Sequence, residues 1–389
     1  MLDRIAVVTP LFPIRQEPFR GQPIYLTVRE LAKLVRVKVF CPQARYPNSR
    51  RLQPRNYVYY PPASYHPEGV EACYFAYPAL PAVSRPLNGW MCERMLRPLV
   101  SAWKPDAILS YWLYPEGWSA VLTAERLGVP VIVGTRGSDL SAGMDGLAKF
   151  QTSRVLHRAN GVLAVSNELK RQAVAWGVPA GKVKVVVNGC DPSIFHPRDR
   201  QMERKRWNVS PEAEVVVFVG HLVAGKGVRE LVEAVEKLAG RRPRLEVALI
   251  GDGNLESDLR HQAERRGVQD RVRFVGRANA ADIGSWLGAC NVFTLPSYSE
   301  GCPNVVIEAL ACGRPVVAAN VGGIPDLVSD GTGILIPPRD SGALASALDK
   351  ALSESWDEAK IAGGWARGWG QVAGETLDFC EQIASAAHG

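Results

Sequence analysis

Short apolar runs rich in β-branched residues alternate with amphipathic helical segments along nearly the whole chain. The pattern occurs once in the first half of the chain and again in the second half. Such runs are typical of parallel strands buried on both faces, with the helical segments as covering layers. The expected strands are residues 5–8, 37–40, 107–109, 131–133, 162–164, 183–187, 215–219, 245–250, 272–275, 292–295, 316–318 and 333–336. We therefore expect an α/β protein with two doubly wound parallel sheets, which bind ligands at the carboxyl ends of their strands.

The length of the chain also favours two domains. It has 389 residues, of which 47% are hydrophobic, and a single core normally stops growing well below this size. A polar stretch containing Pro192 and Pro197 separates the two alternations. We expect a first domain at residues 1–190, a linker at 191–212, a second domain at 213–356, and a C-terminal helix at 357–389 that packs back on the first domain. Residues 41–86 show no clear period and are expected to form an irregular insertion.

Positive charge is concentrated in the first half of the chain. Residues 1–190 hold 24 Lys and Arg against 12 Asp and Glu, whereas the remaining residues hold 22 against 27. A basic domain attracts phosphate-bearing ligands or a membrane surface, and the alternative is a solvated basic face. Nucleic acid is not expected as a partner, because no Lys/Arg cluster alternates with aromatic residues.

Neither a membrane span nor a metal site is expected. No apolar run approaches the roughly 18 residues that cross a bilayer, and the opening run at residues 5–8 is too short for a signal peptide. The eight cysteines include no Cys-x-x-Cys pair, and the six histidines show no metal-ligand spacing. We therefore expect a cytoplasmic protein with reduced thiols, no metal and no cofactor.

The most informative motif is the stretch 296–308, which reads Pro-Ser-Tyr-Ser-Glu-Gly-Cys-Pro-Asn-Val-Val-Ile-Glu. It has the pattern of a strand, a tight turn and a helix, and Pro303 suits the first helical position. Free amides at the helix start can bind phosphate or hydroxyl groups. Glu300 precedes this helix and Glu308 lies inside it, so each carboxylate can accept hydrogen bonds from vicinal hydroxyls. The alternative is a carboxylate that balances the helix dipole plus a solvated helix glutamate.

Together with its surroundings, this motif resembles the donor signature of the retaining family 4 glycosyltransferases, also called glycosyl transferases group 1. Three other segments carry the resemblance. Residues 219–227 are similar to the family's phosphate loop, residues 188–197 to its interdomain element, and residues 322–326 to its closing loop. The resemblance covers essentially all of residues 130–340.

The resemblance implies the GT-B architecture, in which two Rossmann-like domains face a central cleft and the second binds most of the nucleotide-sugar. It implies that Glu308 binds the ribose, that Glu300 contacts the transferred sugar, and that Lys226 neutralises charge on the departing β-phosphate. The implied donor-binding residues are Gly21, Gly220, His221, Lys226, Arg277, Glu300, Gly301, Cys302, Pro303, Asn304 and Glu308. For Gly21, a simple turn is the alternative.

The sequence departs from the family pattern at two places. His221 stands where the family often has arginine, and Arg136 stands where a His-Gly-x-Asp motif commonly begins. Arg136 is similar to the residue found in relatives that build exopolysaccharide and teichuronic acid. We count Arg136 with Lys226 and Glu300 among the candidate catalytic residues, with an ion pair to Asp139 as the alternative.

The resemblance implies a hexosyl-type transferase (EC 2.4). It would move a sugar from a UDP- or GDP-linked donor, with retention, to a glycan or lipid-linked acceptor in cell-surface polysaccharide biosynthesis. The basic first domain fits an acceptor presented at the inner membrane face, with the protein bound there peripherally. Two alternatives are a noncatalytic sugar-nucleotide-binding scaffold and an NAD-dependent oxidoreductase. The sequence Gly251-Asp252-Gly253 disfavours the oxidoreductase, because the third glycine of a dinucleotide fingerprint is missing, and it is interpreted as a strand-to-helix turn.

Overall fold

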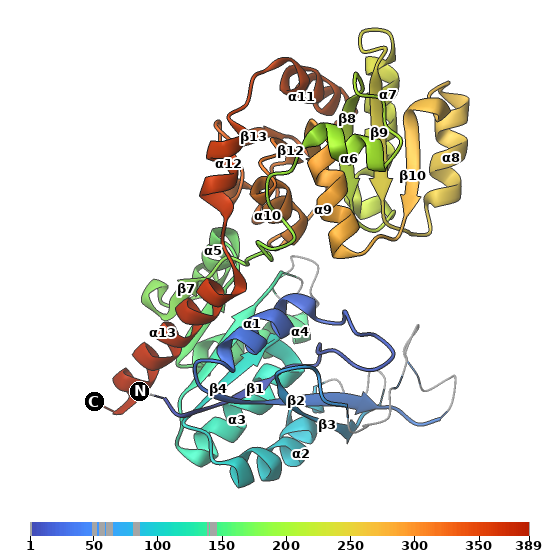
Figure 1. The fold of residues 1–389 in the computed structure, drawn as a ribbon. Coiled ribbons are helices and arrows are strands. Elements are labelled where there is room, and N and C mark those ends of the chain that lie inside the picture. The colour runs from blue at the N-terminus through green and yellow to red at the C-terminus, as the bar shows by residue number, and fades with distance from the viewer. Residues whose placement is uncertain are drawn as a thin grey trace. The chain divides into compact units, whose positions relative to one another are not determined.

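The chain forms two compact units, each built on one parallel sheet (Figure 1). The computed structural model describes residues 2–48, 53, 59, 65–80, 86–137, 140 and 146–388. Unit 1 comprises Met1–Val187 and Trp369–Gly389, and unit 2 comprises Asn188–Gly368.

Unit 1 contains a seven-stranded sheet in the order β3-β2-β1-β4-β5-β6-β7, with every strand pair parallel. Its strands are β1 Arg4–Val8, β2 Arg36–Arg45, β3 Glu71–Pro78, β4 Ala107–Tyr111, β5 Val131–Thr135, β6 Gly161–Ala164 and β7 Val183–Val185. Its helices are α1 Gln22–Leu31, α2 Asn88–Trp103, α3 Trp118–Leu127, α4 Gly146–Arg158, α5 Asn167–Ala175 and α13 Trp369–His388. Helices α1 and α13 cover one face of the sheet, and α2 and α3 cover the other (Figure 1).

The core of unit 1 explains why the end of the chain belongs to it. Trp369, Ala373 and Cys380 on α13 are buried in the same cluster as Ile5 and Val39 on the central strands. Burying this apolar helix face removes it from water and joins residues more than 300 positions apart. The last helix therefore forms a covering layer of the first sheet.

One strand of unit 1, β3, lies in the segment 41–86, for which the sequence predicted an irregular insertion. Strand β2 continues to Arg45, and β3 pairs beside it from Lys38 opposite Glu71 to Arg45 opposite Pro78. As an edge strand, β3 is only partly covered, so exposed and buried residues are mixed along it. The expectation of an irregular insertion was wrong for these residues, because the apolar period of an edge strand is weak.

Unit 2 contains a six-stranded parallel sheet in the order β10-β9-β8-β11-β12-β13. Its strands are β8 Glu214–Val219, β9 Leu245–Ile250, β10 Val272–Gly276, β11 Val292–Leu295, β12 Val316–Ala319 and β13 Gly333–Ile336. Its helices are α6 Arg200–Arg206, α7 Val228–Ala239, α8 Glu256–Arg265, α9 Ala280–Ala289, α10 Asn304–Ala311, α11 Ser341–Ser353 and α12 Glu358–Trp365. Helix α7 packs beside α11, and α9 packs beside α6 and α10.

The boundaries of unit 2 differ from the expected linker at 191–212 and the expected single C-terminal helix at 357–389. Residues 191–212 belong to unit 2, where the buried Arg204 of α6 donates to the Ala289 carbonyl at 3.1 Å and to Asn291 Oδ1 at 2.7 Å. Residues 357–389 form two helices, and α12 stays in unit 2 through the 3.0 Å ion pair of Glu358 with Arg314. The chain therefore passes from unit 1 to unit 2 after Val187 and returns to unit 1 after Gly368.

Candidate functional site

The loops that follow β8, β9, β10 and β11 come together at the carboxyl edge of the unit 2 sheet. The Gly220 amide donates to the Ile250 carbonyl at 2.9 Å, and the Gly251 amide donates to the Gly276 carbonyl at 2.8 Å. The Tyr298 amide donates to the Gly225 carbonyl at 2.8 Å. These bonds connect each loop to its neighbour, so residues from four separate parts of the sequence form one surface.

The loop after β8 depends on a glycine next to Lys226. Gly227 has φ 68°, and a Cβ atom at this position would lie 2.0 Å from the Pro296 carbonyl oxygen. Only glycine combines this left-handed conformation with such a close approach. The short helix Ala224–Lys226 is thereby held against the segment that follows β11.

Lys226 and Glu300 form the central ion pair of the site. Lys226 Nζ donates to Glu300 Oε1 at 2.5 Å, and the Glu300 side chain is mostly buried. The backbone of Glu300 is fixed by the loop at 322–323, since its carbonyl accepts from the Gly323 amide at 3.3 Å. Gly322 has φ 55°, and a Cβ there would lie 1.6 Å from the Glu300 carbonyl oxygen. The pair therefore places a cation and a carboxylate at fixed positions at the sheet edge.

Helix α10 begins directly after Glu300 and carries Glu308. Pro303 is its N-cap, one position earlier than the expected first helical position. The Asn188 amide nitrogen donates to Asn304 Oδ1 at 2.7 Å and to the Cys302 carbonyl at 3.5 Å. The first turn of the helix is thus held in place by a side chain from the start of unit 2.

Glu308 is half-buried, and burial raises the pKa of its carboxyl from 4.5 to about 7. Within unit 2, all of whose residues the structure describes, no group donates a hydrogen bond to this carboxylate. A desolvated carboxyl without a donor costs free energy in the ligand-free protein. Such a group is suited to accept hydrogen bonds from a ligand.

Asp252 is a charged residue of this edge that the sequence analysis did not count as a site residue. Its Oδ2 accepts from Arg277 Nε at 2.6 Å, and its Oδ1 lies 3.6 Å from His221 Nδ1. The hydrogen bond from Arg277 lowers the pKa of Asp252. His221 and Arg277 are both exposed and share this carboxylate, so Asp252 orients two donor-binding candidates from different loops.

The remaining candidates of unit 2 lie at the same edge. Gly220 directly follows β8, and Gly301 and Cys302 lie between Glu300 and α10. All three are half-buried. All ten candidate residues that belong to unit 2, Lys226 included, therefore lie at the carboxyl edge of its sheet.

Two predicted site residues belong to unit 1. Gly21 precedes α1 with φ 63°, and a Cβ there would lie 2.2 Å from the Leu11 carbonyl oxygen, so the close packing of the loop accounts for this glycine. Arg136 follows β5, and its guanidinium lies 5.5 Å from the centre of the Tyr111 ring. Asp139, the alternative partner of Arg136, lies outside the described residues.

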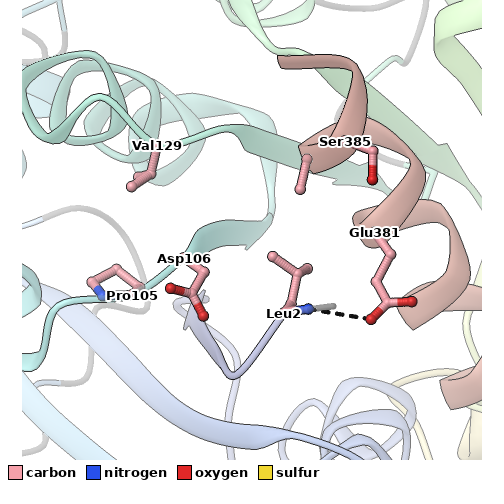
Figure 2. Close-up of a pocket in the computed structure, with 7 residues that line it drawn as sticks. Leu2, Pro105, Asp106, Val129, Glu381 and Ser385 are labelled. Carbon is pink, nitrogen blue, oxygen red and sulfur yellow. Dashed lines mark hydrogen bonds between the residues drawn. The ribbon is translucent and has the colours of Figure 1, made fainter. Parts of the chain in front are cut away.

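A cavity of about 420 Å³ lies at the opposite, amino-terminal edge of the unit 1 sheet (Figure 2). Its polar groups bind the first residues of the chain. Asp106 Oδ2 accepts from the amides of Asp3 and Arg4 at 2.8 and 2.9 Å, and Glu381 Oε1 accepts from the Leu2 amide at 3.2 Å. Because parallel sheets bind ligands at their carboxyl edges, we assign this cavity a structural role.

Replacing Asp106 with alanine is expected to lower the free energy of unfolding by about 1 kcal/mol, because two backbone amides lose a charged acceptor. Urea denaturation checks this, with Asp3→Ala as the control, since the Asp3 side chain makes exposed ion pairs at 3.5 and 3.8 Å with Arg4 and Arg36. Equal stability of the Asp106 variant and the control would contradict the structural role.

The described residues contain no group of three or more His, Cys, Asp or Glu side chains able to hold a metal ion. Among the helices that the structure describes, none is both long and apolar enough to cross a membrane.

Comparisons with known proteins give the class of the chain. The profile described as Glycosyl transferases group 1 matches residues 199–364, and that described as Glycosyl transferase 4-like domain matches residues 22–189. A D-inositol 3-phosphate glycosyltransferase of Catenulispora acidiphila is 33% identical over 294 residues, which cover 69% of this chain and 68% of that protein. The putative teichuronic acid biosynthesis glycosyltransferase TuaC of Bacillus subtilis is 28% identical over 89% of this chain and 88% of its own.

Solved structures agree on the fold. Anabaena HepE in complex with UDP superposes with a TM-score of 0.72 over 99% of both chains at 20% identity. Fold and sequence together define the class: the chain is a glycosyltransferase of the GT-B type, a transferase of class EC 2.4. It belongs to the Glycosyl transferases group 1 family, which is glycosyltransferase family 4.

Proposed function

We propose that this enzyme transfers a hexose or uronic acid from a UDP- or GDP-linked donor, with retention of configuration, to a glycan or lipid-linked acceptor. The observation that carries the proposal is the Lys226–Glu300 pair at 2.5 Å, at the same edge of the unit 2 sheet as the carboxyl of Glu308, to which no group of unit 2 donates a hydrogen bond. A cation and two carboxylates at one edge suit a ligand that combines phosphates with two sets of vicinal hydroxyls.

Each residue has a role that follows from its surroundings. Glu308 accepts hydrogen bonds from the ribose hydroxyls, which satisfy its buried carboxyl. Glu300 contacts the transferred sugar, and Lys226 turns toward the β-phosphate as charge develops on the leaving group. The backbone amides of Gly301, Cys302 and Asn304 bind the sugar or the phosphates at the start of α10.

Further donor contacts come from the rim of the site. Arg277 lines the base pocket, and His221 and Gly220 lie along the phosphates. In unit 1, Gly21 would let the backbone approach the donor phosphates closely, and Arg136 is the candidate catalytic residue. A nucleoside diphosphate is a stable leaving group, and the departing phosphate can take the acceptor proton. The reaction then requires neither a protein nucleophile nor a metal or other cofactor.

The comparisons support this donor and acceptor class. Structures of Anabaena HepE hold UDP, UDP with glucose, or UDP-glucose, which favours a uridine nucleotide here. TuaC is named for teichuronic acid biosynthesis, a polysaccharide pathway of the cell surface. We therefore propose a role in cell-surface polysaccharide biosynthesis, with the enzyme at the cytoplasmic face of the membrane where a lipid-linked acceptor is presented.

A thermal-shift panel with UDP, GDP, ADP, their common sugar conjugates and NADH tests the donor assignment. A ligand that binds only the folded chain raises the melting temperature in proportion to ln(1 + [L]/Kd). We expect one nucleotide-sugar and its parent diphosphate to stabilise the protein, and NADH to have no effect.

The two alternatives give different outcomes in the same experiment. Stabilisation by NADH alone would favour an oxidoreductase and overturn the proposal. A noncatalytic scaffold would be stabilised by the nucleotide-sugar but would neither transfer nor hydrolyse it. Slow release of the free nucleoside diphosphate from the stabilising donor therefore separates the enzyme from the scaffold.

A further inference from the structure

Unit 1 exposes an apolar surface at the beginnings of α2 and α4. Leu87 and Trp90 at the start of α2 are 52% and 38% exposed, and Leu147 and Phe150 at the start of α4 are 45% and 58% exposed. Large apolar side chains gathered in this way are uncommon on a monomer unless the surface binds something. We name these four residues, with Arg94 and Arg154, the α2–α4 surface.

Direct contacts show that the two helices present their residues together. The Arg154 guanidinium lies 5.9 Å from the centre of the Trp90 ring and 5.6 Å from that of Phe150. It lies 4.2 Å from the ring of the buried Trp118 beneath them. The Gln151 side chain donates to the Pro86 carbonyl at 3.1 Å, which ties α4 to the residue preceding Leu87.

On each helix the residues of this surface lie on a single face, as their spacing along the helix shows. Leu147, Phe150 and Arg154 are three and four residues apart along α4, so they share a face of that helix. Leu87, Trp90 and Arg94 repeat the same spacing along α2. On each helix an arginine therefore follows the exposed aromatic residue by one helical turn.

The charge on this surface is positive. Within the part of the chain that the structure describes, neither Arg94 nor Arg154 pairs with a carboxylate. The neighbouring Glu93 is buried and bound to Arg97 at 3.0 Å and to Arg126. The first 190 residues hold 24 basic against 12 acidic residues, so the net charge of this part of the chain is also positive.

We propose that the α2–α4 surface docks unit 1 on an anionic lipid membrane. Tryptophan, phenylalanine and leucine partition into the boundary between headgroups and acyl chains, and arginines are attracted to anionic headgroups. A protein partner would require acidic side chains against Arg94 and Arg154, whereas a lipid surface supplies both the apolar layer and the negative charge. The inference rests on the proposed function in one respect: a lipid-linked acceptor is the reason for this enzyme to bind a membrane.

Co-sedimentation of the full chain with vesicles tests the proposal without donor or acceptor. We expect binding to vesicles of equal parts phosphatidylglycerol and phosphatidylcholine, weak binding to phosphatidylcholine alone, and loss of binding as salt rises. The double variant Leu147→Ser/Phe150→Ser should weaken binding at least about tenfold, because two apolar side chains leave the interface. Arg94→Glu should weaken it further at low salt.

Matched controls use residues outside this surface. Leu34 and Met202 are as exposed as the replaced pair, so Leu34→Ser/Met202→Ser should bind vesicles like the unchanged protein. Lys237→Glu on α7 controls for charge. Circular dichroism and the melting temperature establish that each variant is folded.

Three outcomes would overturn the docking. The folded protein could ignore anionic vesicles, or the α2–α4 double variant could bind as well as the control pair. Concentration-dependent dimerisation that only the α2–α4 variant loses, without vesicle binding, would assign the surface to a second copy of the chain. Donor-induced thermal stabilisation is measured separately in solution, so its persistence in any of these cases leaves the proposed function intact.

Discussion

Replacing Lys226 with alanine is expected to lower kcat by about 10²–10³-fold while the chain stays folded, because one preorganised charge that stabilises the leaving phosphate is lost. In the ligand-free protein this ammonium lies 2.5 Å from Glu300, so its position is fixed before any donor arrives. Initial rates with the donor found by thermal shift check the expectation. In the proposed mechanism the lysine stabilises charge that develops on the leaving phosphate in the transition state. The substitution should therefore lower kcat by a larger factor than it lowers the affinity for the donor.

Two variants sharpen this experiment. Lys237→Ala removes an exposed lysine of the same unit and should leave kcat unchanged. Lys226→Arg keeps the charge but replaces a compact ammonium with a planar fork, and we expect it to recover only part of the lost rate. Turnover by Lys226→Ala at the rate of the unchanged enzyme would remove the lysine from the catalytic site.

Most of the fold could be predicted because buried parallel strands are nearly continuous apolar runs. The runs at 5–8 and 215–219 correspond to β1 and β8, which are interior strands of the two sheets. Strand β3 could not be found in this way, because an edge strand is only partly covered and its residues 71–78 mix exposed and buried positions. Periodicity identifies a strand only where one or both of its faces are consistently buried.

The unit boundaries were harder to predict because they depend on tertiary packing. The polar sequence near Arg204 is typical of a linker, yet this arginine is buried and donates to groups at the end of α9 and beyond it. A buried guanidinium needs such acceptors, and no local pattern reveals where they come from. The same applies to Glu358, whose partner Arg314 lies more than 40 residues earlier.

In the candidate site, too, some residues could be predicted from a local motif and others depend on tertiary packing. Glu300 and Glu308 could be identified because their spacing and the turn between them occur in one continuous motif. Asp252 could not, because its importance comes from the meeting of three loops, which places it between His221 and Arg277. From sequence alone it has the pattern of a strand-to-helix turn, and that is also where it lies.

Replacing Glu308 with glutamine is expected to stabilise the ligand-free protein and to weaken donor binding. Burial raises the pKa of this carboxyl from 4.5 to about 7, so the folded state holds its proton more tightly than the unfolded chain. The free energy of unfolding therefore falls as pH rises through this window, by up to about 3 kcal/mol, and glutamine removes that loss. Urea denaturation at about pH 5 and about pH 8 should show the variant gaining mainly at the higher pH.

In the proposed site the same substitution removes the charged acceptor assigned to the ribose hydroxyls, so the Kd for the donor should rise about 10–100-fold. Glu116 provides a matched control, because it is buried in unit 1 and burial raises its pKa to about 7 as well. Glu116→Gln should reproduce the gain in stability at high pH but keep donor affinity. If Glu308→Gln bound the donor as tightly as Glu116→Gln and the unchanged protein do, Glu308 would be a buried structural carboxyl. Loss of affinity in Glu308→Gln alone would instead mean that its destabilising burial is maintained for the ligand.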